Sequence, residues 1–263
     1  MNKLQTLFSG DRRNLLSVYF TAGYPKINDT IAIAEALEKA GADFLEIGFP
    51  YSDPLADGPV IQHSSQEAIE NGMTLHVLFD QLKALRSRVS IPVLLMGYIN
   101  PVLQYGMEKF CADAAACGVD GFILPDLPMA EYENLYKKQM ESHGLSNVFL
   151  ITPQTSEERI RKIDGLSNAF IYMLSSAATT GKNLDLSDRT EAYFTRIKSM
   201  RLRHPVVIGF GISNHERFAK ACDYARGAIV GSAFVKYLGE TEHYLEEIRG
   251  FISEIKKSPV KTA

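Results

Sequence analysis

The sequence contains no long apolar run. Its first residues, MNKLQTLFSGDRRN, lack the apolar core of a signal peptide, and no later run reaches transmembrane length. It also has no basic tract long enough for a nucleic-acid arm, and its formal charge of -3 gives no general attraction toward nucleic acid or anionic lipid. We therefore expect a cytoplasmic protein that binds neither nucleic acid nor membrane.

Cysteine and histidine are scarce. The three cysteines, Cys111, Cys117 and Cys222, are an odd number in a chain without an export signal, which favours reduced thiols. Cys111 and Cys117 lie in an alanine-rich helical pattern and are expected to be buried structural thiols. The six histidines show neither an HExxH motif nor paired spacing, so we expect no metal site.

What the sequence does contain is one unit repeated eight times. Short apolar runs are each followed by a segment rich in Gly, Pro, Asp or Ser and then by a helical pattern. The runs are LLSVYFT, DFLEIGF, PVLLMGY, GFILPD, VFLITP, AFIYMLS, PVVIGFG and GAIVGS. They are nearly continuous in apolar residues, as expected for parallel strands that are covered on both faces.

This repeat predicts an α/β fold: a single (β/α)8 TIM barrel over residues 1–263, with extra helices at the N-terminus and in loops. The alternative is a two-domain, doubly wound protein, but no GxGxxG motif follows the first strand. Helices are expected over residues 28–40, 107–117 and 131–142. Two of the later helices are predicted to begin with capping boxes, Thr155 with Glu158 and Ser213 with Glu216.

Polar side chains gather at the predicted strand ends, where barrels of this class place their active sites. They are Tyr19, Thr21, Glu46, Tyr98, Asn100, Asp126, Tyr172, Gly211, Gly231 and Ser232. The set holds carboxylates, phenols and glycines, but no Ser-His-Asp triad, helical metal ligands or obvious Schiff-base lysine. It favours acid–base chemistry on an aromatic or apolar substrate.

Glu46 stands near the end of an otherwise apolar strand. Apolar cover from Phe49 and Tyr51 would raise its pKa toward the range useful for proton transfer. The alternative is a carboxylate paired with a cation for stability. Asp53 and Asp57 follow in the next loop, and because both fit common turn signals, their spacing does not rank them.

Two glycine-containing segments, GFGISN and GSAF, follow the seventh and eighth predicted strands, where many barrels bind phosphate. Glycine lets backbone amides approach an anion closely, and a helix that begins near Ser232 would add its positive end. The segment TTGKN after the sixth strand could supply another amide. We therefore expect a phosphate site at this corner.

Several of these motifs resemble one family. EIGFPYSDPLADGPVIQ, together with FTAGYP, MGYINPVLQYG, PDLP, TTG, GFGIS and VGSAFV, resembles the tryptophan synthase alpha chain from about residue 4 to residue 250. The resemblance implies cleavage of indole-3-glycerol phosphate to indole and glyceraldehyde 3-phosphate, without a cofactor of its own. It also implies a role in tryptophan biosynthesis.

The resemblance also implies roles for individual residues. Glu46 matches the general acid–base of the family, and Asp57 matches the second carboxylate, which holds the indole N–H. The resemblance therefore selects Asp57 over Asp53 as the catalytic aspartate of this loop. The expected substrate-binding residues are Tyr19, Tyr98, Ile151, Tyr172, Thr180 and Phe210, and the expected phosphate-binding residues are Gly181, Gly211, Gly231 and Ser232.

The family docks on a beta subunit that carries pyridoxal phosphate. Two alpha and two beta chains are expected, with Asp53 and Pro54 as interface candidates. The chain departs from the common family sequence at three positions after the sixth strand and at Tyr19, where Phe is frequent. The three are Ser176, Ala178 and Thr179, where Arg, Gly and Val are common.

Three functional hypotheses remain open. The chain is an active lyase, a binding subunit that mainly activates its partner, or a barrel enzyme for another phosphorylated substrate.

Overall fold

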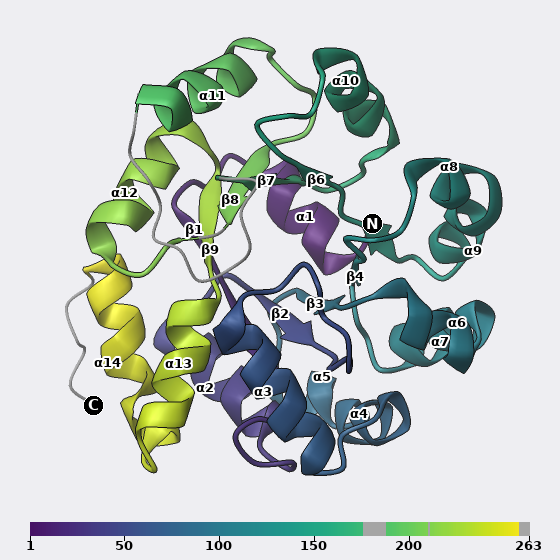
Figure 1. The fold of residues 1–263 in the computed structure, drawn as a ribbon, viewed down its shortest axis with the longest axis vertical. Helices are drawn as coiled ribbons and strands as arrows, with labels where there is room; N and C mark the ends of the chain where they lie inside the picture. Colours follow the sequence, from purple (N-terminus) through teal and green to yellow (C-terminus); the bar gives the residue numbers. More distant parts are fainter. Residues whose placement is uncertain (176–187, 210, 258–263) are drawn as a thin grey trace.

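The strands form one parallel sheet that curls into a barrel inside a ring of helices (Figure 1). The computed structural model describes residues 1–175, 188–209 and 211–257. All strand pairs are parallel, in the hydrogen-bonded order β5-β4-β3-β2-β1-β9-β8-β7-β6. The strands are β1 (Leu15–Thr21), β2 (Phe44–Gly48), β3 (Val93–Met96), β4 (Gly121–Ile123), β5 (Ser146–Asn147), β6 (Leu150–Ile151), β7 (Ile171–Leu174), β8 (Val206–Gly209) and β9 (Gly227–Val230). The predicted (β/α)8 barrel is confirmed.

The fifth predicted run, VFLITP, contains β6 alone, and a further short strand, β5, lies just before it, so two strands stand where one was expected. β5 pairs with β4, whereas β6 pairs with β7. Between them, the Val148 N–H donates to the Phe122 carbonyl and the Phe149 carbonyl accepts from the Tyr172 N–H, each at 2.9 Å. The ladder is interrupted because the strand changes partner here, and this change of partner closes the barrel.

Helices alternate with the strands, and the expected extra helices are present at the N-terminus and in loops. They are α1 (Lys3–Ser9), α2 (Thr30–Ala40), α3 (Pro59–Glu70), α4 (Leu75–Leu82), α5 (Leu85–Arg88), α6 (Ile99–Tyr105), α7 (Met107–Ala116), α8 (Met129–Glu131), η1 (Tyr132–Tyr136), α9 (Lys137–Ser142), α10 (Glu157–Leu166), α11 (Asp188–Ser199), α12 (His215–Tyr224), α13 (Ser232–Glu240) and α14 (Tyr244–Lys256). The helix expected over residues 131–142 is interrupted by the π-helical turn η1.

Both predicted capping boxes begin one residue too early. Ser156 caps α10 and Asn214 caps α12, each through a side-chain oxygen that accepts a backbone N–H of the first turn. Thr155 instead accepts the Thr152 N–H at 2.9 Å, within the preceding turn. Ser213 accepts a hydrogen bond from the Arg217 side chain at 2.7 Å. In both cases two adjacent residues have side chains that can cap a helix, so the sequence does not show which of them is the cap.

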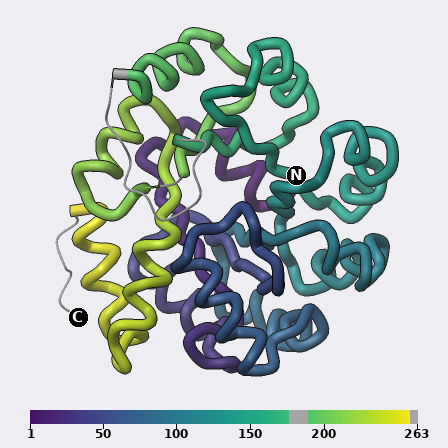
Figure 2. Tube along the Cα trace, viewed as in Figure 1, coloured from purple at the N-terminus to yellow at the C-terminus, as the bar shows by residue number. Residues whose placement is uncertain are grey.

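Side chains alternate between two cores along each strand. Residues such as Leu45 and Ile47 of β2 face the surrounding helices, whereas Phe44 belongs to a cluster inside the barrel. Helix α1 contributes Leu4 and Phe8 to that inner cluster, and its purple trace lies within the helical ring (Figure 2). The Phe8 ring lies 4.7 Å from that of Phe170 and 5.5 Å from that of Phe44. Helix α1 thus closes one end of the barrel.

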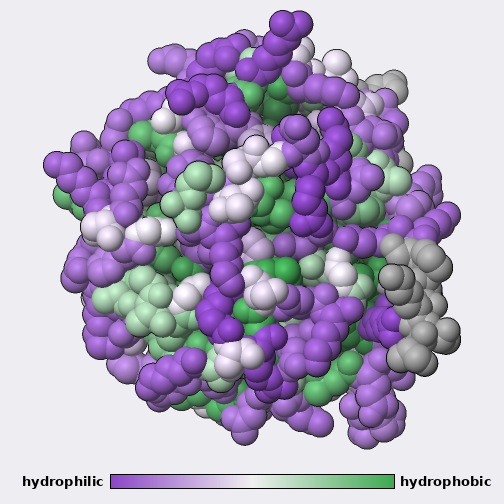
Figure 3. Space-filling view, turned by 180° about the vertical axis from the view of Figure 1, so that it is seen from behind, coloured by the Kyte–Doolittle hydropathy of each residue, from purple (hydrophilic) through white to green (hydrophobic). Residues whose placement is uncertain are grey.

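Hydrophilic side chains cover most of the face opposite to that of Figure 1, with apolar groups scattered between them (Figure 3). Within the described part of the chain, no helix combines the length and apolar character that a membrane crossing requires.

Candidate active site

Glu46 lies inside the barrel. Its side chain alternates with those of Leu45 and Ile47, and it is 0% exposed. The Ser17 hydroxyl on β1 donates to Oε1 of Glu46 at 3.0 Å. The other oxygen, Oε2, has no hydrogen-bond partner among the residues that the structure describes. Half of this buried carboxyl is therefore left unsatisfied, which is costly for a folded chain.

Three other carboxylates are buried in the described residues, and all three are fully engaged. Asp43, Asp120 and Asp164 each accept several hydrogen bonds from backbone N–H groups and basic side chains. Asp120, for example, accepts from the Val93 and Lys3 N–H groups and from Arg86. These contacts identify structural carboxylates.

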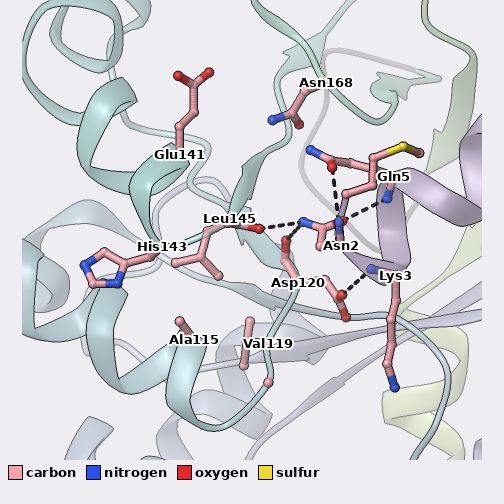
Figure 4. Close-up of a pocket in the computed structure, with 13 residues that line it drawn as sticks. Asn2, Lys3, Gln5, Ala115, Val119, Asp120, Glu141, His143, Leu145 and Asn168 are labelled. Carbon is pink, nitrogen blue, oxygen red and sulfur yellow. Dashed lines mark hydrogen bonds between the residues drawn. The ribbon is translucent and has the colours of Figure 1, made fainter.

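Asp120 lies beside the start of α1, in a polar cavity of about 680 Å³ (Figure 4). There Asn2 donates to the Asp120 and Gly144 carbonyls and to the Ser146 hydroxyl. The polar groups of this cavity hold the N-terminal segment against the barrel.

Burial governs the protonation of Glu46. It raises the pKa of the carboxyl from 4.5 to about 8, and the hydrogen bond from Ser17 opposes part of that rise. No cation is among the causes. A carboxyl with this pKa exchanges its proton readily near neutral pH, as a general acid–base requires.

Asp57 lies in the loop between β2 and α3 and has a different environment. The Tyr98 hydroxyl donates to Asp57 Oδ2 at 3.1 Å and accepts the Ala56 N–H at 3.0 Å. Burial raises the pKa of Asp57 to about 6, while the bond from Tyr98 lowers it. At neutral pH Asp57 is thus mostly ionised, whereas Glu46 is mostly protonated.

A cavity of about 570 Å³ opens at this end of the barrel. It brings together three predicted site residues, Tyr19, Asp57 and Tyr98. Its other lining residues are Phe49, Tyr51, Pro54, Leu55, Ala56, Ser65, Met96, Gly97, Pro125, Leu150, Thr152, Thr155, Arg159 and Leu174. Ile151 is fully buried and does not line the cavity; its neighbours Leu150 and Thr152 do. The strand alternation that decides between them is not fixed by the sequence alone.

Two phenols stand near the carboxyls. Burial is the main cause that raises the pKa of Tyr19, and the negative charge of Asp57 adds to the rise. The pKa of Tyr172 is raised mainly by burial and further by the negative charge of Glu46. Both tyrosines are therefore neutral near pH 7 and keep a hydroxyl that can donate.

Glycines on neighbouring strands make room for these rings. A Cβ at Gly48 would lie 2.2 Å from the Tyr19 hydroxyl oxygen, and one at Gly209 would lie 2.2 Å from that of Tyr172. Both approaches are too close for any other residue without displacement of the ring. The two glycines therefore fix where the phenols lie.

The predicted phosphate corner is described in part. Gly211 has φ +75°, a conformation that favours glycine. Gly231 is the N-cap of α13, and Ser232 is the first residue of that helix. Three predicted site residues, Thr180, Gly181 and Phe210, lie outside the described residues, as do the family departures Ser176, Ala178 and Thr179.

The β2–α3 loop also presents the two interface candidates. Asp53 is exposed and accepts the Ser52 hydroxyl at 2.5 Å, whereas Pro54 lines the cavity. Leu55 is 86% exposed. Sequence reasoning missed Leu55 and also missed Ser17, whose signal was a serine in the apolar run LLSVYFT.

The fold and the site define a barrel enzyme whose cavity is lined by the ionised Asp57, with the protonated carboxyl of Glu46 buried inside the barrel and outside the cavity lining. A model of the family described as "Tryptophan synthase alpha chain" matches residues 6–259. The tryptophan synthase alpha chain of Flavobacterium psychrophilum is 54% identical over 97% of this chain and all of its own length. The chain belongs to the tryptophan synthase alpha chain family.

Solved structures agree. The alpha subunit of tryptophan synthase from Legionella pneumophila is 33% identical, with a TM-score of 0.87 over 98% of both chains. A structure of tryptophan synthase from Mycobacterium tuberculosis is 32% identical, with a TM-score of 0.87 over 97% of both chains.

Proposed function

We propose that Glu46 and Asp57 carry out the carbon–carbon bond cleavage of this family in the present chain. The chain is a lyase that splits indole-3-glycerol phosphate into indole and glyceraldehyde 3-phosphate, in tryptophan biosynthesis. The observation that carries the assignment of Glu46 is its isolation: it is the buried carboxyl with one hydroxyl partner and no cation.

The first step is protonation of indole C3 by Glu46, which is protonated near neutral pH. The ring then becomes electron-poor and can accept the electrons of the carbon–carbon bond. Asp57, which is ionised, accepts the indole N–H and stabilises the positive charge that develops on the ring.

The second step is cleavage. The Glu46 carboxylate takes the proton from the glycerol hydroxyl, the carbonyl of glyceraldehyde 3-phosphate forms, and the bonding electrons return to the indole ring. The proton that Glu46 gave is thus replaced, and the carboxyl is ready for another turnover. Because both proton transfers use Glu46, we propose that the chain needs neither a cofactor of its own nor a metal ion.

The cavity suits an indole ring beside a phosphate. Phe49, Met96, Leu150 and Leu174 supply apolar walls. We assign phosphate binding to Gly211, Gly231 and Ser232, supported by the positive φ of Gly211 and by the start of α13. Tyr19 and Tyr98 add phenols to the lining. Substrate contacts of Tyr172, Ile151, Thr180, Gly181 and Phe210 are assigned by family resemblance.

The partner of this family is a beta subunit. We propose an assembly of two alpha and two beta chains in the cytoplasm, with pyridoxal phosphate on the beta chain and no contact with nucleic acid or membrane. Asp53, Pro54 and the exposed Leu55 are the proposed contact residues, since they stand on the loop that also carries Asp57.

Indole release from indole-3-glycerol phosphate, measured with the purified chain alone and with a beta subunit, tests this function. An active lyase releases indole alone and more with its partner. A chain that releases none alone but stimulates the beta reaction would be an activating subunit. A chain that releases no indole, alone or with the beta subunit, and does not stimulate the beta reaction would act on another phosphorylated substrate.

A further inference from the structure

Ser17 is a buried polar residue among apolar neighbours, so apolar packing does not explain why a serine stands at this position. It lies on β1 with 0% exposure, and its register neighbours are Phe44 on β2 and Ile229 on β9, both in the apolar inner cluster. A buried hydroxyl costs free energy unless it is hydrogen-bonded. Its bond to Glu46, at 3.0 Å, satisfies that need.

We propose that Ser17 is a positioning residue for the reaction: its hydroxyl holds Oε1 of Glu46 and stabilises the carboxylate form. The proposal rests on the proposed function, in which Glu46 both gives and takes a proton. Neither Ser17 nor Glu46 is among the residues that line the cavity, and the hydroxyl of Ser17 contacts the Glu46 carboxyl inside the barrel, so Ser17 acts through Glu46.

A neutral donor suits an acid–base group better than the alternatives. Asp43 and Asp120 are instead paired with basic side chains and serve as structural ion-pair partners. A carboxyl with no donor at all would hold its proton more tightly, because burial alone opposes ionisation. A single neutral hydroxyl donor is intermediate between a basic partner and no donor, so both the protonated and the ionised forms of Glu46 remain accessible.

Among the residues that the structure describes, the other titratable groups that interact with Glu46 or its neighbours are two phenols and a carboxyl, none of them cationic. Tyr19 on β1 and Tyr172 on β7 are electrostatically coupled to it, and Asp57 in the β2–α3 loop is coupled to both tyrosines. None of these can replace a lost donor by charge attraction. Removal of the Ser17 hydroxyl should therefore change the proton affinity of Glu46 without compensation.

The test uses the Ser17→Ala chain and two measurements. The first is the pH dependence of kcat for indole release. The second is the titration of the Glu46 carboxyl carbon by ¹³C NMR in the ligand-free chain, with its signal assigned from its loss in Glu46→Gln. In both, the Glu46 titration should move to higher pH by about one unit or more, because the lost hydrogen bond stabilised the ionised form of the carboxyl.

Two further variants serve as controls. Ser17→Thr keeps the hydroxyl and should restore the wild-type titration. Ser146→Ala removes another fully buried serine hydroxyl from a barrel strand, where its partner is Asn2, and should leave the titration unmoved.

A Ser17→Ala chain that titrates like the wild type would overturn the proposal, even if its stability or kcat had changed. Undiminished turnover of Glu46→Gln would instead overturn the proposed role of Glu46. The NMR titration would still report whether Ser17 tunes that carboxyl, so the two failures are distinguishable.

Discussion

At the residue scale, the site depends on two carboxyls kept in different surroundings. Glu46 is enclosed in the barrel with one hydroxyl partner, whereas Asp57 stands at the cavity with a phenol partner. Burial raises both pKa values, but to about 8 for Glu46 and only about 6 for Asp57. The difference gives one acid and one anion at the same pH.

Burial of Glu46 also makes stability depend on pH. The folded carboxyl holds its proton up to about pH 8, whereas the unfolded one releases it near 4.5, so the folded state binds more protons between these values. The contribution of Glu46 to stability therefore falls as the pH rises through this window, by at most about 1.4 kcal/mol for each unit.

Glu46→Gln removes this dependence. Relative to the wild type, the variant should gain stability between pH 5 and pH 8.5, measured by urea unfolding at both values. A stability difference that stays constant, or that shrinks toward pH 8.5, would show that the folded carboxyl is already ionised in this window.

The loop aspartates should differ in effect. Asp57→Asn should lower kcat strongly, because a neutral amide cannot offset the positive charge that forms on the indole ring. Asp53→Asn should affect the isolated chain less, since Asp53 is exposed and does not line the cavity. Steady-state kinetics of both variants check the ranking, and the reverse order would refute our assignment.

At the element scale, α1 is a structural plug. Phe8 packs against Phe44 and Phe170 inside the barrel, at the end where the strands begin. Phe8→Ala should lower the free energy of unfolding by about 3–5 kcal/mol. Turnover per folded molecule should stay close to wild type, because Phe8 does not line the site cavity.

The matched control for that variant is Leu135→Ala, at a side chain 62% exposed, which should change stability by less than about 0.5 kcal/mol. Equal losses in the two variants, measured by urea unfolding, would mean that α1 does not anchor the inner cluster.

The sequence predicted the elements better than their ends. Apolar runs and turn residues identified the barrel strands other than β5, because parallel strands that are covered on both faces are rich in apolar residues, whereas β5 consists of Ser146 and Asn147. The division into β5 and β6 depends on a change of hydrogen-bond partner, which no local pattern records. Likewise, the adjacent capping residues Thr155 and Ser156 are chemically alike, so the start of α10 was misplaced by one residue.

The β2–α3 loop joins the site to the proposed partner surface. Pro50, Pro54 and Pro59 restrict its backbone, while Asp57 faces the cavity and Leu55 is exposed. If beta-subunit binding shifts this loop toward a productive form, the partner should increase indole release.

Pro54→Ala should then reduce the stimulation by the beta subunit more than it reduces the basal rate. The measurement is cleavage rate against beta-subunit concentration for wild-type and variant chains. An unchanged fold-stimulation at saturating partner, with only the basal rate altered, would show that Pro54 shapes the loop without transmitting the effect.

At the scale of the whole molecule, the two ends of the barrel have separate tasks. Asp43 and Asp120 stand just before β2 and β4 and bind backbone N–H groups and basic side chains, which secures the end where strands begin. Asp57 and the cavity occupy the other end, as in other barrels of this class. Asp57 lies at this end because it follows β2 in a parallel sheet, in which all strands end on the same side, whereas Glu46 is the third of the five residues of β2.

The hydrogen-bond partners of Glu46 and Asp57 could not be predicted from the sequence. Ser17 meets Glu46 only because β1 and β2 pair in one register, and Tyr98 meets Asp57 only through the fold of the loop after β2. The sequence therefore predicted candidate groups for the chemistry, but not the hydrogen-bond partners that influence their protonation.

The central claim is that the isolated carboxyl of Glu46 transfers the protons of the cleavage. Its most direct test is the steady-state rate of indole release by Glu46→Gln, with folding checked by circular dichroism. We predict a folded chain whose kcat falls at least about a hundredfold while KM stays close to wild type, because the amide fills the same space but cannot exchange a proton. A folded Glu46→Gln chain with near-normal kcat would contradict this account.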